Sequence, residues 1–213
     1  MQVYQIRIKL YMLTDVALNR IQTNLTAFID KGFLENEELL QMHEENKFKN
    51  YCYDLPYPIE KDKIYKKGKI YTVTIRTIDP RLAKYFQEVC VNSYTDEVKG
   101  LTSEIRIIPK KVIDSIYTLT PVILKDDKGY WRKHMQLAEF ENQLKVNLIK
   151  KWNAFTGEKL SEDFNLYTLL EFLNETPVPM ENKTAQKLAY MALGTGLLNM
   201  NSRGAGYVNY RWL

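Results

Sequence analysis

The sequence has few of the residues from which metal centres and disulfide frameworks are built. Its 213 residues include two cysteines, Cys52 and Cys90, and two histidines, His43 and His134. Two scattered cysteines are typical of reduced structural thiols, and the four residues together show no metal-site spacing. We therefore expect neither a disulfide framework nor a metal or other cofactor.

The chain also lacks a long apolar run and a large excess of one charge. No stretch approaches the ~20 apolar residues that a membrane-spanning helix needs, and the N-terminal MQVYQIRIKL has no signal-peptide core. The net charge of +4 only weakly indicates a nucleic-acid partner. We expect a cytoplasmic protein without membrane contact.

Lysines nevertheless gather in two places. The two groups are Lys61, Lys63, Lys66, Lys67 and Lys69, and Lys145, Lys150 and Lys151. Charge runs of this kind are most often solvated faces of a folded protein, and we interpret both groups in this way.

Hydrophobic patterning over residues 1–125 predicts the order βαββαβ. Residues 2–12 alternate as a strand, Asp15 is expected to cap a helix that ends near Lys31, and a short helix is expected over 36–44. The later elements are strands at 50–57 and 63–78 with KKGK as a hairpin turn, a helix from Asp79 to Asn92, and strands at 103–109 and 113–125. This order is that of the ferredoxin-like fold, which RNA-recognition modules also use.

The second half of the chain reads as a shorter version of the same pattern. Residues 126–129, DDKG, predict a boundary between a first domain over 1–125 and a second over 126–213. Helices are expected over 137–155 and 185–193, with a strand candidate, LYTLLEFL, at 166–173. We expect an α+β protein of two tandem ferredoxin-like domains, the second one reduced.

The stretch MHEENKFKNYCY, residues 42–53, contains residues suited to RNA cleavage. Cleavage by the 2′-hydroxyl of RNA needs a base, an acid and a cation near the phosphate. A histidine with a pKa near neutrality suits the proton transfers, and lysine suits the phosphate, so His43 and Lys49 form a minimal set. A lone histidine is more often a surface or capping residue, which is our interpretation of His134.

Four of the nine glycines fall within thirteen residues near the C-terminus, at Gly194, Gly196, Gly204 and Gly206. Such a segment is expected to leave backbone N–H groups unpaired and open to a phosphate, with Arg203 as an additional forked donor. The segment lacks the GK[ST] ending of a nucleotide-binding P-loop. A tight structural turn explains the glycines equally well.

Three stretches, taken in order, resemble a known family. They are MHEENKFKNYCY, YTLTPVIL at residues 117–124, and GTGLLNMNSRGAGYV at residues 194–208, with its core from Asn201 to Tyr207. Together they are similar to motifs of the CRISPR-associated endoribonucleases of the RAMP superfamily, which cut CRISPR precursor RNA within its repeats. The glycine-rich stretch is the most specific of the three.

The resemblance implies metal-independent cleavage that leaves a 2′,3′-cyclic phosphate and a 5′-hydroxyl. It makes His43 the general acid and base and Lys49 the phosphate stabiliser. The residues that it implies for RNA binding are Gly194, Gly196, Asn201, Ser202, Arg203, Gly204 and Gly206. The implied partners are repeat RNA and other subunits of a CRISPR effector complex, with the protein a monomer or a homodimer.

One departure from the family pattern concerns a third catalytic residue. Some members carry a tyrosine on the first helix, where this chain has Thr26 and Phe28, and Tyr51 or Tyr53 are the candidate substitutes. Two alternatives to a nuclease stay open: a non-cleaving RNA-binding subunit of a CRISPR effector complex, and a ferredoxin-like domain pair unrelated to RNA.

Overall fold

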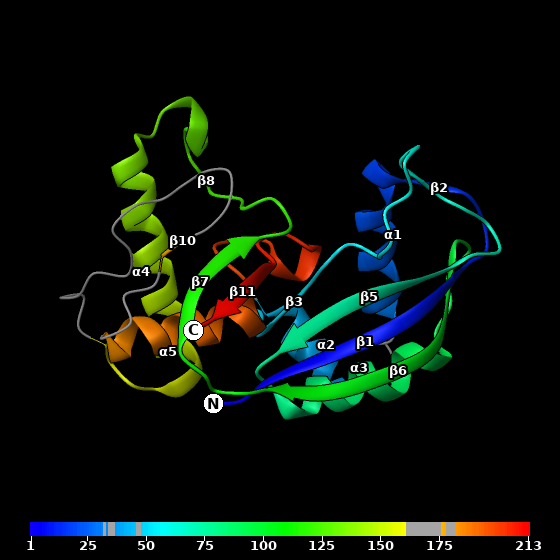
Figure 1. Ribbon diagram of the computed structural model, residues 1–213, viewed down its shortest axis with the longest axis horizontal. Coiled ribbons are helices and arrows are strands. Elements are labelled where there is room, and N and C mark those ends of the chain that lie inside the picture. The colour runs from blue at the N-terminus through cyan, green and yellow to red at the C-terminus, as the bar shows by residue number, and fades with distance from the viewer. Residues whose placement is uncertain (32, 34–36, 46–47, 161–175, 178–181) are drawn as a thin grey trace.

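Two antiparallel sheets, each packed against helices, organise the chain (Figure 1). The computed structural model describes residues 1–31, 33, 37–45, 48–160, 176–177 and 182–213. The first sheet contains β1 (Val3–Met12), β3 (Tyr51–Tyr53), β5 (Ile70–Thr77) and β6 (Val98–Ile108), in the order β3-β5-β1-β6. The second contains β7 (Ile113–Thr118), β10 (Thr176–Pro177) and β11 (Val208–Trp212), in the order β10-β7-β11.

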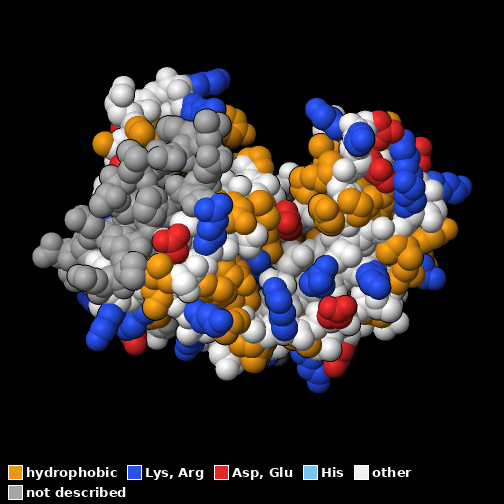
Figure 2. Space-filling model, in the orientation of Figure 1, with side chains coloured by type: hydrophobic (Ala, Val, Ile, Leu, Met, Phe, Trp, Pro, Cys, Tyr) orange, Lys and Arg blue, Asp and Glu red, His pale blue; other side chains and the backbone are white. Residues whose placement is uncertain are grey.

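Helices α1 (Leu18–Lys31) and α3 (Pro80–Asn92) pack on one face of the first sheet, and α2 (Glu37–Glu44) precedes β3. The alternation of β1 buries Ile6, Ile8 and Leu10 completely on this face. The opposite face carries exposed basic side chains, including Arg7 and Lys9, and Figure 2 shows Lys and Arg side chains across it. If the four strands are numbered 1 to 4 along the chain, their order in the sheet is 2-3-1-4, which is the ferredoxin-like order.

The second sheet is packed against α4 (Leu137–Thr156) and α5 (Lys183–Thr195). In the order β10-β7-β11, its strands correspond to the third, first and fourth strands of a ferredoxin-like fold. Both halves of the described chain therefore combine helices with an antiparallel sheet, as in the α+β class. The helices expected over 137–155 and 185–193 are confirmed, and α4 ends where Gly157 adopts φ of 74°. The strand candidate at 166–173 lies outside the described residues.

One predicted strand belongs to the other half of the molecule. The segment expected as the last strand of the first domain, 113–125, forms β7 over Ile113–Thr118, which pairs with β10 and β11. The chain leaves the first sheet after β6, where Pro109 offers no N–H to extend the ladder. By sheet membership the chain therefore changes halves at residues 109–112, earlier than the division predicted at 125 and 126.

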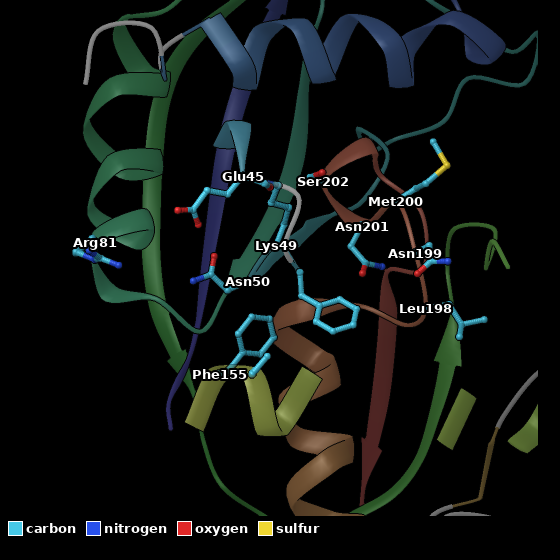
Figure 3. Close-up of a pocket in the computed structure, with 12 residues that line it drawn as sticks. Glu45, Lys49, Asn50, Arg81, Phe155, Leu198, Asn199, Met200, Asn201 and Ser202 are labelled. Atoms are coloured by element: carbon cyan, nitrogen blue, oxygen red, sulfur yellow. The ribbon is translucent and has the colours of Figure 1, made fainter. Parts of the chain in front are cut away.

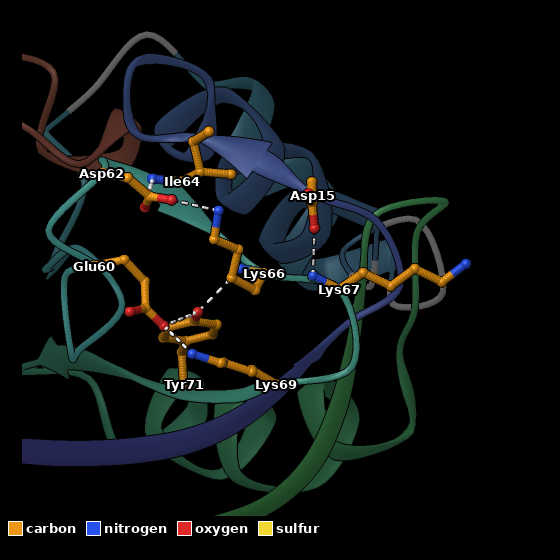
Figure 4. Close-up of polar contacts among 8 residues, drawn as sticks. All are labelled: Asp15, Glu60, Asp62, Ile64, Lys66, Lys67, Lys69 and Tyr71. Carbon is orange, nitrogen blue, oxygen red and sulfur yellow. Dashed lines mark hydrogen bonds and ion pairs between the residues drawn. The ribbon is translucent and has the colours of Figure 1, made fainter.

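The first lysine group is partly neutralised by its own acidic neighbours (Figure 4). Lys66 forms an ion pair with Asp62, and Lys69 Nζ lies 2.9 Å from Glu60 Oε1. These pairs lie at the surface, as expected of a solvated face. The segment is thus less basic toward a partner than its composition indicates.

The structure corrects two local predictions in this region. Asp15 does not cap a helix, because α1 begins at Leu18 and the Asp15 carboxylate accepts the N–H of Lys67 at 2.7 Å (Figure 4). The KKGK turn is present, with Gly68 at φ of 80°, but its first arm, β4 (Ile64–Tyr65), pairs with β2 (Val16–Ala17) instead of β5. In contrast, Asp79 caps α3 as expected, accepting the N–H of Arg81.

Two shorter features complete the described chain. Strands β8 (Lys125–Asp126) and β9 (Gly129–Tyr130) form a hairpin that leads into the 3-10 helix η2 (Trp131–Lys133), and a second 3-10 helix, η3 (Asn201–Arg203), precedes β11. Among the described residues, no helix combines the length and the apolar character that a membrane span needs.

Candidate functional site

A cleft separates the segment that joins α2 to β3 from the loop that follows α5. Its volume is about 770 Å³. Figure 3 shows Lys49 near its centre, with Asn201 and Ser202 of the loop on one side and Phe155 of α4 below. The described residues that line it are Glu45, Phe48, Lys49, Asn50, Arg81, Ala154, Phe155, Leu198, Asn199, Met200, Asn201 and Ser202. Two segments far apart in the sequence, both predicted to be functional, thus share one cavity.

Lys49 is held by a contact within its own segment. Its Nζ donates to the Glu45 carbonyl oxygen at 2.7 Å, which aims the ammonium along the cleft wall. Partial burial lowers the pKa of Lys49, while the carboxylate of Glu45 raises it and the guanidinium of Arg203 lowers it. The structure therefore brings Lys49 into electrostatic contact with the glycine-rich loop, as the cleavage hypothesis requires.

The backbone of His43 lies in the last turn of α2, which ends at Glu44. This agrees with the predicted position of the histidine at a helix end, six residues before Lys49. The side chain of His43 lies outside the described part of the structure. Its role as a general acid and base stays a prediction.

The glycines of the C-terminal loop allow the protein to pack against itself. A Cβ on Gly194 would lie 2.8 Å from Ile78 Cγ2, so α5 can approach the first sheet only where this side chain is missing. Gly196, Gly204 and Gly206 have φ of 69°, 78° and 67°, which favours glycine strongly. What approaches these backbone positions is therefore other parts of the same chain.

The expected open backbone at these glycines is wrong. The N–H of Gly196 donates to the Ala192 carbonyl and that of Gly206 to the Pro121 carbonyl, both at 2.8 Å. A buried, hydrogen-bonded N–H has no free donor for a phosphate. The predicted RNA-binding residues that are buried, and so shape the loop instead of presenting a surface, are Gly194, Gly196, Asn201, Gly204 and Gly206.

A buried lysine holds this loop in place. Lys151 of α4 is only 1% exposed, and its Nζ donates to the carbonyl oxygens of Thr195 and Gly196, at 3.3 and 2.9 Å, and to Asn201 Oδ1 at 2.6 Å. The Asn201 amide in turn donates to the Leu197 carbonyl oxygen at 2.9 Å. Burial lowers the pKa of Lys151 to about 7. One ammonium thus joins α4, the end of α5 and the turn at η3.

The interpretation of Lys151 as a solvated lysine was wrong, although the sequence contains a signal for its burial. Lys151 lies three residues after Leu148 and seven after Leu144, which places it on the apolar face of α4. Its neighbour Lys150 is exposed, as expected. A lysine at a core position of a helix is rarely fully buried without partners, so this spacing was informative.

The exposed part of the loop is formed by Asn199, Met200, Ser202 and Arg203. Arg203 Nη1 forms an ion pair with Asp30 Oδ2 at 2.8 Å, and its carbonyl accepts from Gln22 Nε2 at 2.6 Å. Both contacts attach the loop to α1. The Arg203 side chain stays about half exposed, at 49%, so it can still offer donors to a ligand.

The hydroxyls of the two candidate tyrosines have different surroundings: that of Tyr51 lies beside Ser202, which lines the cleft, and that of Tyr53 faces α1. Tyr51 and Tyr53 are both almost completely buried, and burial raises the pKa of each. The Tyr53 hydroxyl shares a 2.5 Å hydrogen bond with the Thr26 hydroxyl of α1. The Tyr51 ring packs against Phe33 and against Phe86 of α3 in the first core.

The second histidine lies outside the cleft. His134 Nε2 is 2.9 Å from Asp126 Oδ1 and holds the β8–β9 hairpin against η2. This supports its interpretation as a structural residue.

The fold and the cleft define a class of protein that is known from solved structures. The chain is similar to "An RAMP protein binding different RNA substrates", at 14% identity and a TM-score of 0.69, with 98% of this chain and 99% of that one covered. It is also similar to a Cas6-related protein from Pyrococcus furiosus, at 15% identity and a TM-score of 0.66, with 98% of both chains covered. For Cas6 of Thermus thermophilus the values are 12% and 0.56, with 99% and 98% covered. At these identities the likeness concerns the fold, and it confirms two tandem ferredoxin-like domains.

The family itself follows from the sequence of the second half. Residues 104–210 match the profile of the family described as CRISPR associated protein Cas6, C-terminal. The chain belongs to the Cas6 family, and this membership connects it with CRISPR-associated RNA processing. No curated protein matches the chain.

Proposed function

We propose that this protein is a metal-independent endoribonuclease that cleaves CRISPR precursor RNA within its repeats. One observation carries the proposal: Lys49 and three residues of the exposed part of the C-terminal loop, Asn199, Met200 and Ser202, line the same cleft. His43 lies in the last turn of the helix that leads into this cleft. Repeat RNA would be the partner, and other CRISPR proteins would receive the product in the cytoplasm.

The chemistry uses the RNA's own 2′-hydroxyl. His43 takes the 2′ proton while the 2′ oxygen bonds to the adjacent phosphorus, and the bond from phosphorus to the 5′ oxygen breaks. A protonated imidazole then supplies the proton that the departing 5′ oxygen needs. The Lys49 ammonium offsets the negative charge that develops on the phosphorane oxygens. Each step follows from the residue types and from their shared segment.

The C-terminal loop would hold the RNA opposite Lys49. Ser202 offers a hydroxyl and Arg203 a forked guanidinium, two groups that suit phosphate oxygens. The buried glycines and the Lys151–Asn201 contact keep this exposed edge in one conformation. We assign RNA contact to the edge and support to the buried residues.

A repeat-cleavage assay in EDTA tests the proposal. The purified protein should cut repeat RNA, His43→Ala should abolish cutting, and His134→Ala, the matched control outside the cleft, should leave it intact. A single 2′-deoxy sugar at the scissile position should be bound and left uncut. Cleavage of that substrate, or full activity of His43→Ala, would contradict the mechanism.

A non-cleaving RNA-binding subunit is the second candidate. The observation that favours it is the half-exposed guanidinium of Arg203 at the edge of the loop, because a forked donor binds phosphate without any proton transfer. Such a subunit would bind repeat RNA in the same assay with no turnover.

A further inference from the structure

Two aromatic side chains meet in the wall of the cleft beside Lys49. Phe48 immediately precedes Lys49, and Phe155 lies in the last turn of α4. Their ring centroids are 6.5 Å apart, with an interplanar angle of 68°. Both rings are partly buried and both line the cleft, where Figure 3 shows Phe155 below Lys49. The two halves of the molecule therefore contribute one ring each to the same pocket.

This edge-to-face contact leaves aromatic surface for a ligand. In such a pair the edge of one ring meets the face of the other, so the ring that supplies its edge keeps its own faces for further stacking. Phe155 is also packed against the second core, which fixes its position. A preorganised ring of this kind binds a flat ligand with little loss of side-chain entropy.

The composition of the cleft identifies the ligand as a nucleotide with an unpaired base. Lys49 brings positive charge, and Glu45 is the one carboxylate among the described lining residues. Arg81 also lines the cleft, but its guanidinium is paired with the Asp79 carboxylate at 2.9 Å. Leu198 and Met200 add an apolar wall, and Met200 is 52% exposed. A flat apolar surface next to positive charge matches a base attached to a phosphate. The volume of the cleft lies in the range of small-molecule pockets.

We propose that Phe48 and Phe155 form a stacking site for an unpaired RNA base next to the phosphate held at Lys49. This rests on the proposed RNA-processing function and adds a contact that the cleavage chemistry does not need. The site fixes the strand by its base, and Lys49 acts on the phosphate. Because every base has a flat face, the site tolerates different bases at that position.

The test uses a short RNA oligomer in which a single 2-aminopurine is the only base and every other position carries an abasic sugar, so no other base can occupy the site. The fluorescence of 2-aminopurine is quenched when it stacks. Phe155→Leu keeps an apolar side chain against the core and removes the ring, so affinity should fall roughly tenfold and the quenching should disappear. Phe48→Leu should act in the same direction. Phe155→Tyr, which restores a ring, should recover both readouts.

Tyr94→Leu is the matched control, because Tyr94 is an exposed aromatic side chain that does not line the cleft. It should leave affinity and quenching unchanged. Thermal unfolding of each variant checks that the fold is kept. An oligomer with an abasic sugar in place of the 2-aminopurine should bind wild type about as weakly as the intact oligomer binds Phe155→Leu. Its affinity for Phe155→Leu should be no lower than its affinity for wild type.

The outcomes separate this proposal from the proposed function. If wild type binds and cuts RNA but Phe155→Leu and Phe48→Leu bind and quench like wild type, the stacking site is refuted and the nuclease stands. If the phenylalanine substitutions lower the affinity for the abasic oligomer as much as the affinity for the intact one, the rings do not touch a base. If wild type binds no RNA, both proposals fail.

Discussion

Lys151→Met removes the buried ammonium that joins α4 to the C-terminal loop. Three acceptors lose the Lys151 donor: the carbonyl oxygens of Thr195 and Gly196, and Asn201 Oδ1. The Gly196 carbonyl keeps a second donor, the Thr195 hydroxyl at 3.4 Å. A buried polar group without a partner costs roughly 1–3 kcal/mol, so the other two acceptors together cost about 4 kcal/mol. The substitution also relieves a cost, because wild type must bury an amine that is charged in the unfolded chain.

The relieved cost depends on pH in a known direction. Burial lowers the pKa of Lys151 from 10.5 to about 7, so between these values the unfolded chain binds more protons and stability rises with pH. At pH 7 the cost in wild type is about 4 kcal/mol, and at pH 9 it is about 2 kcal/mol, from the difference between the two pKa values. A neutral amine still has two N–H donors for the Thr195 carbonyl oxygen and Asn201 Oδ1, so the loss of these contacts counts at both pH values. Lys151→Met should therefore leave the free energy of unfolding nearly unchanged at pH 7 and lower it by about 2 kcal/mol at pH 9.

Urea unfolding of wild type and Lys151→Met at both pH values measures this difference directly. Subtracting the two curves cancels the groups that do not interact with Lys151. Cys52 does interact with it, but burial raises the pKa of Cys52 to about 12, so in the folded protein it stays a neutral thiol at both pH values. Lys150→Met, the exposed neighbour, should change stability by no more than about 0.5 kcal/mol at either pH. A Lys151→Met protein as stable as wild type at pH 9, or a difference that shrinks as pH rises, would refute the role of Lys151 in holding the loop.

Other substitutions test the loop and the cleft. Gly206→Ala places a Cβ on the Leu197 carbonyl oxygen and should lower the melting temperature far more than Gly157→Ala, which has a similar positive φ and no atom within 4 Å. The Gly157 change should cost only about 1–2 kcal/mol of backbone strain. Arg203→Gln should weaken RNA binding and reduce the salt dependence of log K by about one phosphate contact, with little effect on stability because its ion pair is half exposed. Lys49→Ala should lower the single-turnover cleavage rate more than RNA affinity, because it acts on charge in the transition state; an equal loss in both would assign Lys49 to binding alone.

Local sequence signals were sufficient for most of the elements. The alternation of residues 2–12, the Asp79 cap and the stop at Gly157 each depend on a residue and its near neighbours in the chain, and each is confirmed. The alternative given for the glycine-rich tail, a tight structural turn, agrees with the positive φ values at Gly196, Gly204 and Gly206. The family followed from short motifs, because those motifs are contiguous.

What the sequence left open depends on segments that are distant in the chain. An alternating strand does not specify its partner, so only the tertiary structure assigns β7 to the second sheet. Burial of Lys151 and of the loop glycines is likewise decided where α4, α5 and η3 meet. Periodicity reports which side of an element is apolar, because that depends on spacing alone. Periodicity does not report which groups from other elements pack against the apolar side. The packing of segments that are distant in the sequence decides this, and it also decides whether a cleft stays open between them.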